Sequence, residues 1–211
     1  MCKEKKYLQL TYSYLHLRRA VGLIGVLLPP ILVLGAMLIF GGKTIQPSIS
    51  HYYHTVMRDL FVGALCAVAL FMFFYSGHDK WDDWTGHATG AFALVVAWFP
   101  TTETGPSDGI GKIHFIFAAL FFLSLIVFTL VLFRRKDQNP TPEKLFRNKV
   151  YLGCGIIMSL CLLSIVLYLN FLSDGTPSSF FVFCAETLAL VAFGVSWLIK
   201  GGTLWADKGD G

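Results

Sequence analysis

The sequence predicts an all-α membrane protein: a bundle of six transmembrane helices with the N-terminus and the C-terminus both in the cytoplasm. Of the 211 residues, 55% are hydrophobic and only 14% are charged, whereas a soluble domain carries roughly 25% charged residues. The apolar residues also come in blocks about as long as a bilayer is thick. Together these observations exclude a soluble globular chain and a disordered one.

Six apolar blocks are the predicted spans: residues 20–40, 56–75, 84–99, 113–133, 150–172 and 180–199. A helix rises about 1.5 Å per residue, so about 20 residues cross about 30 Å of hydrocarbon. The third block is short, and its helix is expected to begin within residues 82–85, where an Asp or Thr caps the first turn. Residues 1–19 and 201–211 are then cytoplasmic segments that flank a transmembrane domain of residues 20–200.

The basic residues determine the orientation. With the N-terminus inside, 14 of the 17 Lys and Arg residues lie on the cytoplasmic side and the other 3 lie outside. The positive-inside rule therefore favours this topology, and we expect the protein in the inner (plasma) membrane. The net charge of +4 reflects this asymmetry, so no nucleic-acid partner is expected. The basic loop of residues 134–149 either anchors the protein at the interface or attracts anionic headgroups, and membrane lipids are the expected partners.

Small residues and prolines predict how the helices pack. Pro29 and Pro30 fall inside the first span and should kink it, because they remove two amide donors. Close backbone approach is expected at glycines of the first, third and fifth spans, namely Gly22, Gly25, Gly86, Gly90, Gly153 and Gly155. The cysteines form no CxxC pair and are expected to be free thiols rather than disulfides or zinc ligands: Cys2, Cys66, Cys154, Cys161 and Cys184.

Polar side chains gather at the predicted outer ends of the spans. If the segment before the second span is helical from a Ser48 or Ser50 cap, Ser50 and His54 are four residues apart and His51 and His54 three, so they share a face. Glu186 sits six residues into the sixth span, about 9 Å deep, and should hydrogen-bond His114, Arg58 or His54. The whole outer set is Ser48, Ser50, His51, Tyr52, Tyr53, His54, Arg58, Asp59, His114 and Glu186.

Three interpretations of this outer set compete. It is a structural network in which Arg58 pairs with Asp59 or Glu186. Alternatively, it is a binding or conduction site for a small molecule or an ion, open to the outside and built from Ser50, His51, His54, Arg58, Asp59, His114 and Glu186. The third interpretation is a zinc centre that activates water, with weak candidate ligands His51, His54, His114 and Glu186. The HExxH motif is absent, and no other cofactor is expected.

A second polar set lies at the predicted inner end, in the segment GHDKWDDWTGH. Its titratable members are His78, Asp79, Asp82, Asp83 and His87. The spacing and the glycine of an EF-hand calcium loop are missing. We therefore expect a solvated turn that caps the next helix, with Trp81 and Trp84 in the interfacial belt.

Several segments carry a family resemblance: SISHYYHTVMRDLFVGALCAVALFMFFYSG, GHATGAFALVVAWFP, GKIHFIFAALFF and ETLALVAFGVSWLIKG. They resemble a bacterial six-span family of unknown function that is distantly similar to the DRAM-like group of eukaryotic membrane proteins. The shared features are a Pro-x-Ile-Ser element, here Pro47–Ser50, and a His that opens the fourth span, here His114. The resemblance implies six helices with cytoplasmic ends, no established reaction, and a link to lipid handling in some relatives.

A second resemblance is to the membrane hydrolases that include alkaline ceramidases, whose Ser-x-x-x-His element Ser50 and His54 match. The late HxxxH pair of those enzymes is absent, and the final span offers only Glu186. The predicted function is therefore a non-enzymatic binding or permeation element, with a lipid-related role implied by the first resemblance. The alternatives are a zinc-dependent membrane lipid hydrolase and a purely structural or interaction protein.

Overall fold

The computed structural model confirms the all-α class. It describes residues 2–39, 41, 45–77, 79–105, 107–135, 139–172, 180–203 and 205, with side chains from residue 14 onward, and no strand occurs among them. The six α-helices of this described part are α1 (Cys2–Leu34), α2 (Arg58–Phe73), α3 (Lys80–Trp98), α4 (Gly109–Val127), α5 (Pro142–Phe171) and α6 (Phe180–Lys200). Three shorter helical segments accompany them: the π-helical η1 (Gly35–Ile39) after α1, the 3-10 helix η2 (Ser50–His54), and the π-helical η3 (Phe128–Leu132) after α4.

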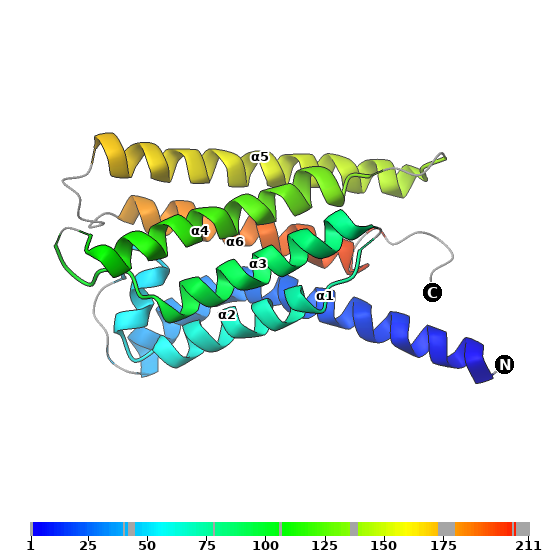
Figure 1. Cartoon of the computed structure of the whole chain (residues 1–211), viewed down its shortest axis with the longest axis horizontal. Helices are drawn as coiled ribbons and strands as arrows, with labels where there is room; N and C mark the ends of the chain where they lie inside the picture. Colours follow the sequence, from blue (N-terminus) through cyan, green and yellow to red (C-terminus); the bar gives the residue numbers. More distant parts are fainter. Residues whose placement is uncertain are drawn as a thin grey trace.

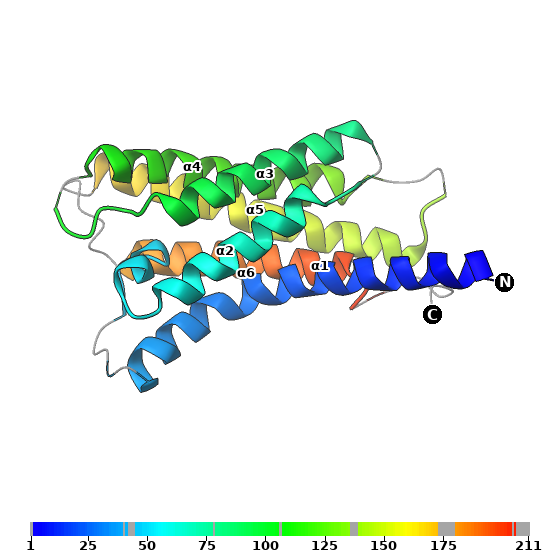
Figure 2. The same cartoon turned by 60° about the horizontal axis from the view of Figure 1, so that its bottom comes forward.

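The helices form a closed ring in which neighbours in sequence are neighbours in space. Each helix packs on the next, and α6 returns to pack on α1. All six run roughly along the long axis of the molecule (Figure 1). One end of the ring holds η2 and the segment that joins α3 to α4, and we call it the η2 end. The opposite end, called the terminal end, holds the start of α1 and the end of α6 (Figure 2).

Four helical stretches are long and apolar enough to cross a membrane, judged on the described residues: Tyr14–Ile39, Gly109–Leu132, Pro142–Phe171 and Phe180–Lys200. The chain is thus a helical protein with several candidate membrane spans. Helix α2 falls short with 16 residues, and α3 carries Lys80, Asp82 and Asp83 in its first turn. These two helices nevertheless lie antiparallel to each other within the ring (Figure 1).

Several helix boundaries differ from those read from hydropathy. Helix α1 already begins at Cys2, far before residue 20, because the polar N-terminal residues continue the helix beyond the apolar block. Helix α3 begins at Lys80 rather than within residues 82–85. The reason is that Asp79, not a later residue, is its cap: the Asp79 carboxylate accepts the backbone N–H groups of Trp81 and Asp82, each at 3.1 Å.

The prolines bend α1 without ending it. Pro29 and Pro30 lie inside the helix, and the axis of α1 turns in its second half (Figure 2). The π-helical η1 follows directly at Gly35. The predicted kink is therefore present, and it directs the end of α1 away from the straight path of its first half.

Glycines allow two pairs of helices to approach closely. A Cβ on Gly22 would stand 2.9 Å from the Gly194 carbonyl oxygen, which fixes the contact of α1 with α6. On α3, a Cβ on Gly86 would lie 2.9 Å from the Met72 carbonyl oxygen, and one on Gly90 would lie 2.9 Å from that of Ala69, so α2 fits against this face. The expectation for Gly153 was wrong, because that position faces open space.

The terminal half of the ring is filled by aromatic side chains. Trp197 of α6 is fully buried, and its ring centroid lies 5.1–6.0 Å from those of five neighbours: Phe71, Tyr75, Phe128, Phe133 and Phe193. Such edge-to-face and tilted pairs add to the free energy gained by burial. The four described cysteine side chains, Cys66, Cys154, Cys161 and Cys184, are free thiols as predicted; the side chain of Cys2 lies outside the described residues.

Candidate functional site

The histidine segment before α2 is a 3-10 helix rather than the α-helix expected from its sequence. Three residues per turn place His51 and His54 on one face, and their ring centroids lie 6.5 Å apart. The predicted alignment of Ser50 with His54 over four residues does not hold in this geometry. The turn begins at Ser48, whose hydroxyl oxygen accepts the His51 backbone N–H at 3.2 Å and lies 2.7 Å from His51 Nδ1.

Each of the three outer histidines hydrogen-bonds to a nearby group of the protein. His54 Nε2 donates to the Thr101 carbonyl oxygen at 2.7 Å. His114 Nδ1 donates to the Phe99 carbonyl oxygen at 2.6 Å. These two bonds tie η2 and α4 to the segment that follows α3. The two histidines therefore connect the segments of the η2 end by hydrogen bonds.

The surroundings of His51, which lies outside the predicted spans, shift its pKa. The pKa of His51 is lowered to about 4, chiefly by burial and in smaller part by the positive charge that His54 and His114 would carry. A neutral ring at pH 7 accepts a hydrogen bond at Nδ1 from the Ser48 hydroxyl. His51 is thus built to stay uncharged.

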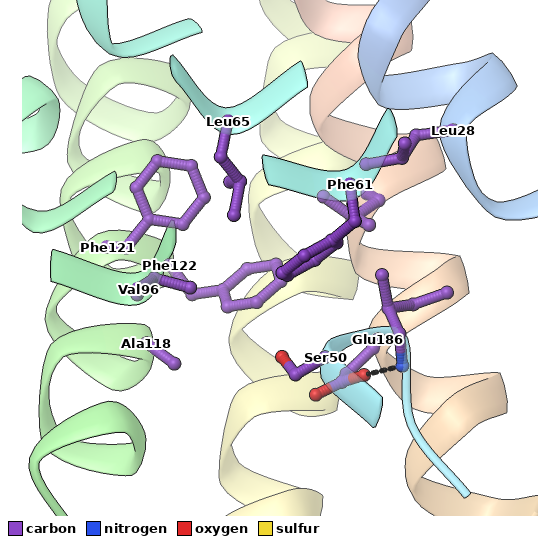
Figure 3. A pocket seen from close by; sticks show the side chains of 11 residues that line it. Leu28, Ser50, Phe61, Leu65, Val96, Ala118, Phe121, Phe122 and Glu186 are labelled. Atoms are coloured by element: carbon purple, nitrogen blue, oxygen red, sulfur yellow. Dashed lines mark hydrogen bonds between the residues drawn. The ribbon is translucent and has the colours of Figure 1, made fainter. Parts of the chain in front are cut away.

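Glu186 finds a partner that the sequence did not predict. Its Oε2 atom accepts the backbone N–H of Ile49 at 2.6 Å (Figure 3). The prediction that Glu186 bonds to His114, Arg58 or His54 is wrong. The two histidines donate to carbonyl oxygens, and Arg58 donates to the Tyr53 hydroxyl. The turn that begins at Ser48 instead presents an amide to α6 at the depth of the carboxylate. A half-buried carboxylate is thereby given one hydrogen bond from the backbone.

Arg58 and Asp59 lie on the exposed surface at the start of α2. The Arg58 guanidinium stands 4.6 Å from the centre of the Tyr53 ring and donates to the Tyr53 hydroxyl at 3.1 Å. This arrangement replaces the ion pair expected with Asp59 or Glu186. Both residues line a pocket of about 440 Å³ together with Tyr53 and Trp98, and Glu186 does not belong to this lining.

A cavity opens inside the ring next to Glu186. It has a volume of about 40 Å³, enough for about three water-sized spheres. Two polar side chains, Ser50 and Glu186, stand at its η2 end, and apolar side chains form the rest (Figure 3). Five α-helices, η2 and the turn before η2 contribute the lining: Leu28, Ile49, Ser50, Phe61, Leu65, Val96, Ala118, Phe121, Phe122, Glu186 and Leu190.

The residues expected to bind zinc do not converge. Among the residues that the structure describes, no group of three His, Cys, Asp or Glu side chains stands close enough to hold a metal ion. His51 turns to Ser48, His54 to Thr101 and Glu186 to Ile49. The chemistry available at the cavity is therefore that of one carboxylate and one hydroxyl beside an apolar space.

The inner polar set supplies a helix cap as the sequence predicts, but the expected solvated turn is wrong in part, because Asp82 is buried and Asp82, Asp83 and His87 lie within α3. The Asp79 carboxylate caps α3, and the backbone N–H of Asp82 is the main cause that lowers its pKa. Arg135 bridges Asp79 at 3.0 Å and the buried Asp82 at 3.3 Å. Asp83 accepts the Gly77 N–H at 3.0 Å, and His87 Nδ1 donates to the Asp83 carbonyl oxygen at 2.6 Å. His78 lies outside the described residues.

Sequence reasoning missed the apolar part of the site. Phe61, Phe121 and Phe122 look like any other lipid-facing residues of an apolar block, and no local pattern marks them as cavity walls. The Ile49 amide carries no sequence signal at all, since every residue except proline has a backbone N–H group.

The chain matches no protein-family model, no curated protein and no solved structure. Its function therefore has to follow from the geometry of these residues.

Proposed function

We propose that the chain is a six-span protein of the inner (plasma) membrane that binds a slender amphiphile, one alkyl chain with a hydrogen-bond-donating head, without catalysing a reaction. The terminal end lies in the cytoplasm, and the η2 end faces outside. The asymmetry of 14 against 3 basic residues supports this orientation. Helices α2 and α3 count as spans because they are members of the same closed ring as the four apolar stretches.

The single observation that carries the binding function is the cavity with its uneven lining. Phe61, Phe121 and Phe122 offer an apolar wall for an alkyl chain. Glu186 and Ser50 offer oxygen atoms to an amine or alcohol head at the η2 end. A volume of about 40 Å³ holds about three water-sized groups, so it admits the head and the first methylene groups of a narrow chain and excludes a bulky substrate. The resemblance to a six-span family of unknown function, some of whose distant relatives are linked to lipid handling, favours a ligand of this class.

Permeation is the weaker alternative because Trp197 and its aromatic neighbours fill the ring on the terminal side of the cavity. A zinc-dependent lipid hydrolase is weaker as well, because its expected ligands point to other groups. Stoichiometric zinc in purified, metal-analysed protein would contradict this preference. A purely structural role remains as the outcome if no ligand binds.

The test uses neighbouring alanines of α4. Ala118 lines the cavity, whereas Ala119 belongs neither to the cavity nor to the packed core. The full chain in lipid nanodiscs is incubated with a photoreactive dodecylamine, and labelled peptides are identified by mass spectrometry. We expect labels on α2 and α4, reduced about tenfold by Ala118→Phe and little changed by Ala119→Phe, since only the first fills the cavity.

A second pair of probes tests the head group. Glu186→Gln removes the negative charge but keeps an acceptor oxygen, so it should weaken labelling by the amine and spare labelling by the matching dodecanol probe. Labels that spread over the lipid-facing residues and respond equally to Ala118→Phe and Ala119→Phe would show simple partition into the bilayer. That result would overturn the binding function.

A further inference from the structure

The terminal end holds a group of positive charges that the cavity does not involve. Arg18 of α1, Lys144 and Arg147 of α5, and Lys200 of α6 form what we call the basic cluster. All four side chains are half-buried. The ammonium group of Lys200 lies within electrostatic reach of the other three. Three helices that are separate in sequence thus bring their cations to one place at the mouth of the ring.

Aromatic rings hold the cluster in position. The Lys200 Nζ atom stands 5.3 Å from the centre of the Phe133 ring, and the Lys144 Nζ atom stands 5.9 Å from that of Tyr151. The two rings are themselves neighbours, with centroids 5.5 Å apart. Two ammonium groups are therefore held over adjoining rings, in the manner of cation–π contacts.

Arg18 completes the cluster from the opposite side. Its guanidinium carbon lies 4.4 Å from the centre of the Tyr14 ring and 5.7 Å from that of Tyr75. Its Nε atom is buried and has no hydrogen-bond partner among the described residues. A guanidinium with an unused donor, stacked on tyrosines rather than paired with a carboxylate, is available to an added acceptor.

One acid of the described residues, Asp82, lies near the cluster. The Asp82 carboxylate attracts the Lys200 ammonium group, whereas the three other cations repel it. Asp82 also pairs with Arg135 at 3.3 Å. Gathering like charges in a half-buried place costs free energy, and a bound anion offsets that cost. Basic pockets between membrane helices at the cytoplasmic side are suited to phosphate-bearing headgroups.

We propose that the basic cluster binds a phosphate monoester group, with Arg18 and Lys200 as its main contacts. A tetrahedral group with several charged oxygens can meet cations from α1, α5 and α6 together. The group belongs either to a membrane lipid or to a soluble phosphate compound. The basic cluster lies at a different end of the ring from the amphiphile cavity, so binding at one end is tested independently of binding at the other.

Isothermal titration calorimetry on the purified full chain in neutral micelles tests the proposal. The probes are dioctanoyl phosphatidic acid, inorganic phosphate and dioctanoyl phosphatidylcholine. We expect saturable binding of phosphatidic acid and none of phosphatidylcholine. Binding of inorganic phosphate with a similar affinity would identify a soluble source, and binding of phosphatidic acid alone would identify a lipid.

Matched lysines separate a site from diffuse charge. Lys200→Gln and Arg18→Gln should each weaken phosphatidic acid binding about tenfold, and Lys200→Arg should retain most of it. Lys149→Gln removes the same charge from an exposed position of α5 and should have little effect. An equal loss in Lys149→Gln and Lys200→Gln, or no binding of either phosphate probe to the unaltered chain, would overturn the proposal.

Discussion

At the η2 end, His54, His114 and Glu186 hydrogen-bond to the backbone, whereas the terminal end is packed mainly with aromatic rings, and cations lie over some of these rings. At the η2 end, the groups that His54, His114 and Glu186 contact are main-chain atoms of irregular segments. At the terminal end, Trp197 and its neighbours pack ring against ring. The comparison teaches that the titratable side chains of the η2 end are accommodated because non-helical backbone supplies hydrogen-bond partners for them.

Helix α6 shows the change along a single face. Glu186 and Leu190 line the cavity, and Phe193 and Trp197 follow at helical spacing in the packed half. The side chains on this face therefore run from a carboxylate to the largest apolar ring. The cavity lies beside the smaller side chains, and it ends where the Trp197 indole fills the space between the helices.

Replacing Trp197 should break the terminal half with the largest effect. Trp197→Ala removes a fully buried ring and should lower the free energy of unfolding by about 3–5 kcal/mol. Trp98→Ala, at a position that is 62% exposed, should cost less than about 1 kcal/mol. Thermal unfolding of both variants in micelles measures the difference. Equal losses would show that the aromatic cluster does not stabilise the ring.

Lowering the pH should weaken the η2 end selectively. The pKa of His51 is about 4 in the fold, against 6.5 for an ordinary histidine, so unfolding takes up a proton between these values. The stabilisation contributed by the neutral His51 ring is fully present above about pH 6.5. As the pH falls towards about 4, the free energy of unfolding decreases by up to about 3 kcal/mol.

Unfolding midpoints measured from pH 7 to pH 4 check this expectation. His51→Gln should flatten the pH dependence because it removes the titrating ring. His87→Gln, at an exposed position of α3 near the terminal end, should leave the dependence as it is. A slope that survives in His51→Gln would assign the titration to another group.

The smallest effect is expected at Glu186. Glu186→Gln retains an oxygen that can accept the Ile49 N–H, so stability should change by less than about 1 kcal/mol. Glu186→Ala leaves that amide without its partner and should cost about 1–3 kcal/mol. Chemical unfolding of both variants compares them. If Gln destabilises as much as Ala, the carboxylate charge itself supports the fold.

Much of the fold could be predicted from the sequence because hydrophobic length is a local property. The apolar blocks gave the six helices and their order, and glycine spacing gave the close approach at Gly86 and Gly90. The ends of the helices were harder to predict, because the cap at Asp79 depends on one side chain. The 3-10 form of η2 was missed because helical spacing alone does not distinguish the two helix types.

The site was only partly predictable for a different reason. Glu186 could be singled out because a carboxylate is costly within an apolar span, and Ser50 because it lies in the polar segment before the second span; both line the cavity. Their surroundings could not be foreseen, since the Phe99 and Thr101 carbonyls and the Ile49 amide are placed by how loops fold over the ring. The cavity arises from side chains of five helices, and no local pattern specifies such an arrangement.

Both proposals require that the η2 end and the terminal end face opposite sides of a membrane. Single cysteines at the exposed positions Thr104 and Asn139, in a chain whose five native cysteines are replaced, test this requirement in intact cells. A membrane-impermeant maleimide should label Thr104→Cys from outside and should reach Asn139→Cys only after the cells are opened. Labelling of Asn139→Cys but not Thr104→Cys in intact cells would contradict the account.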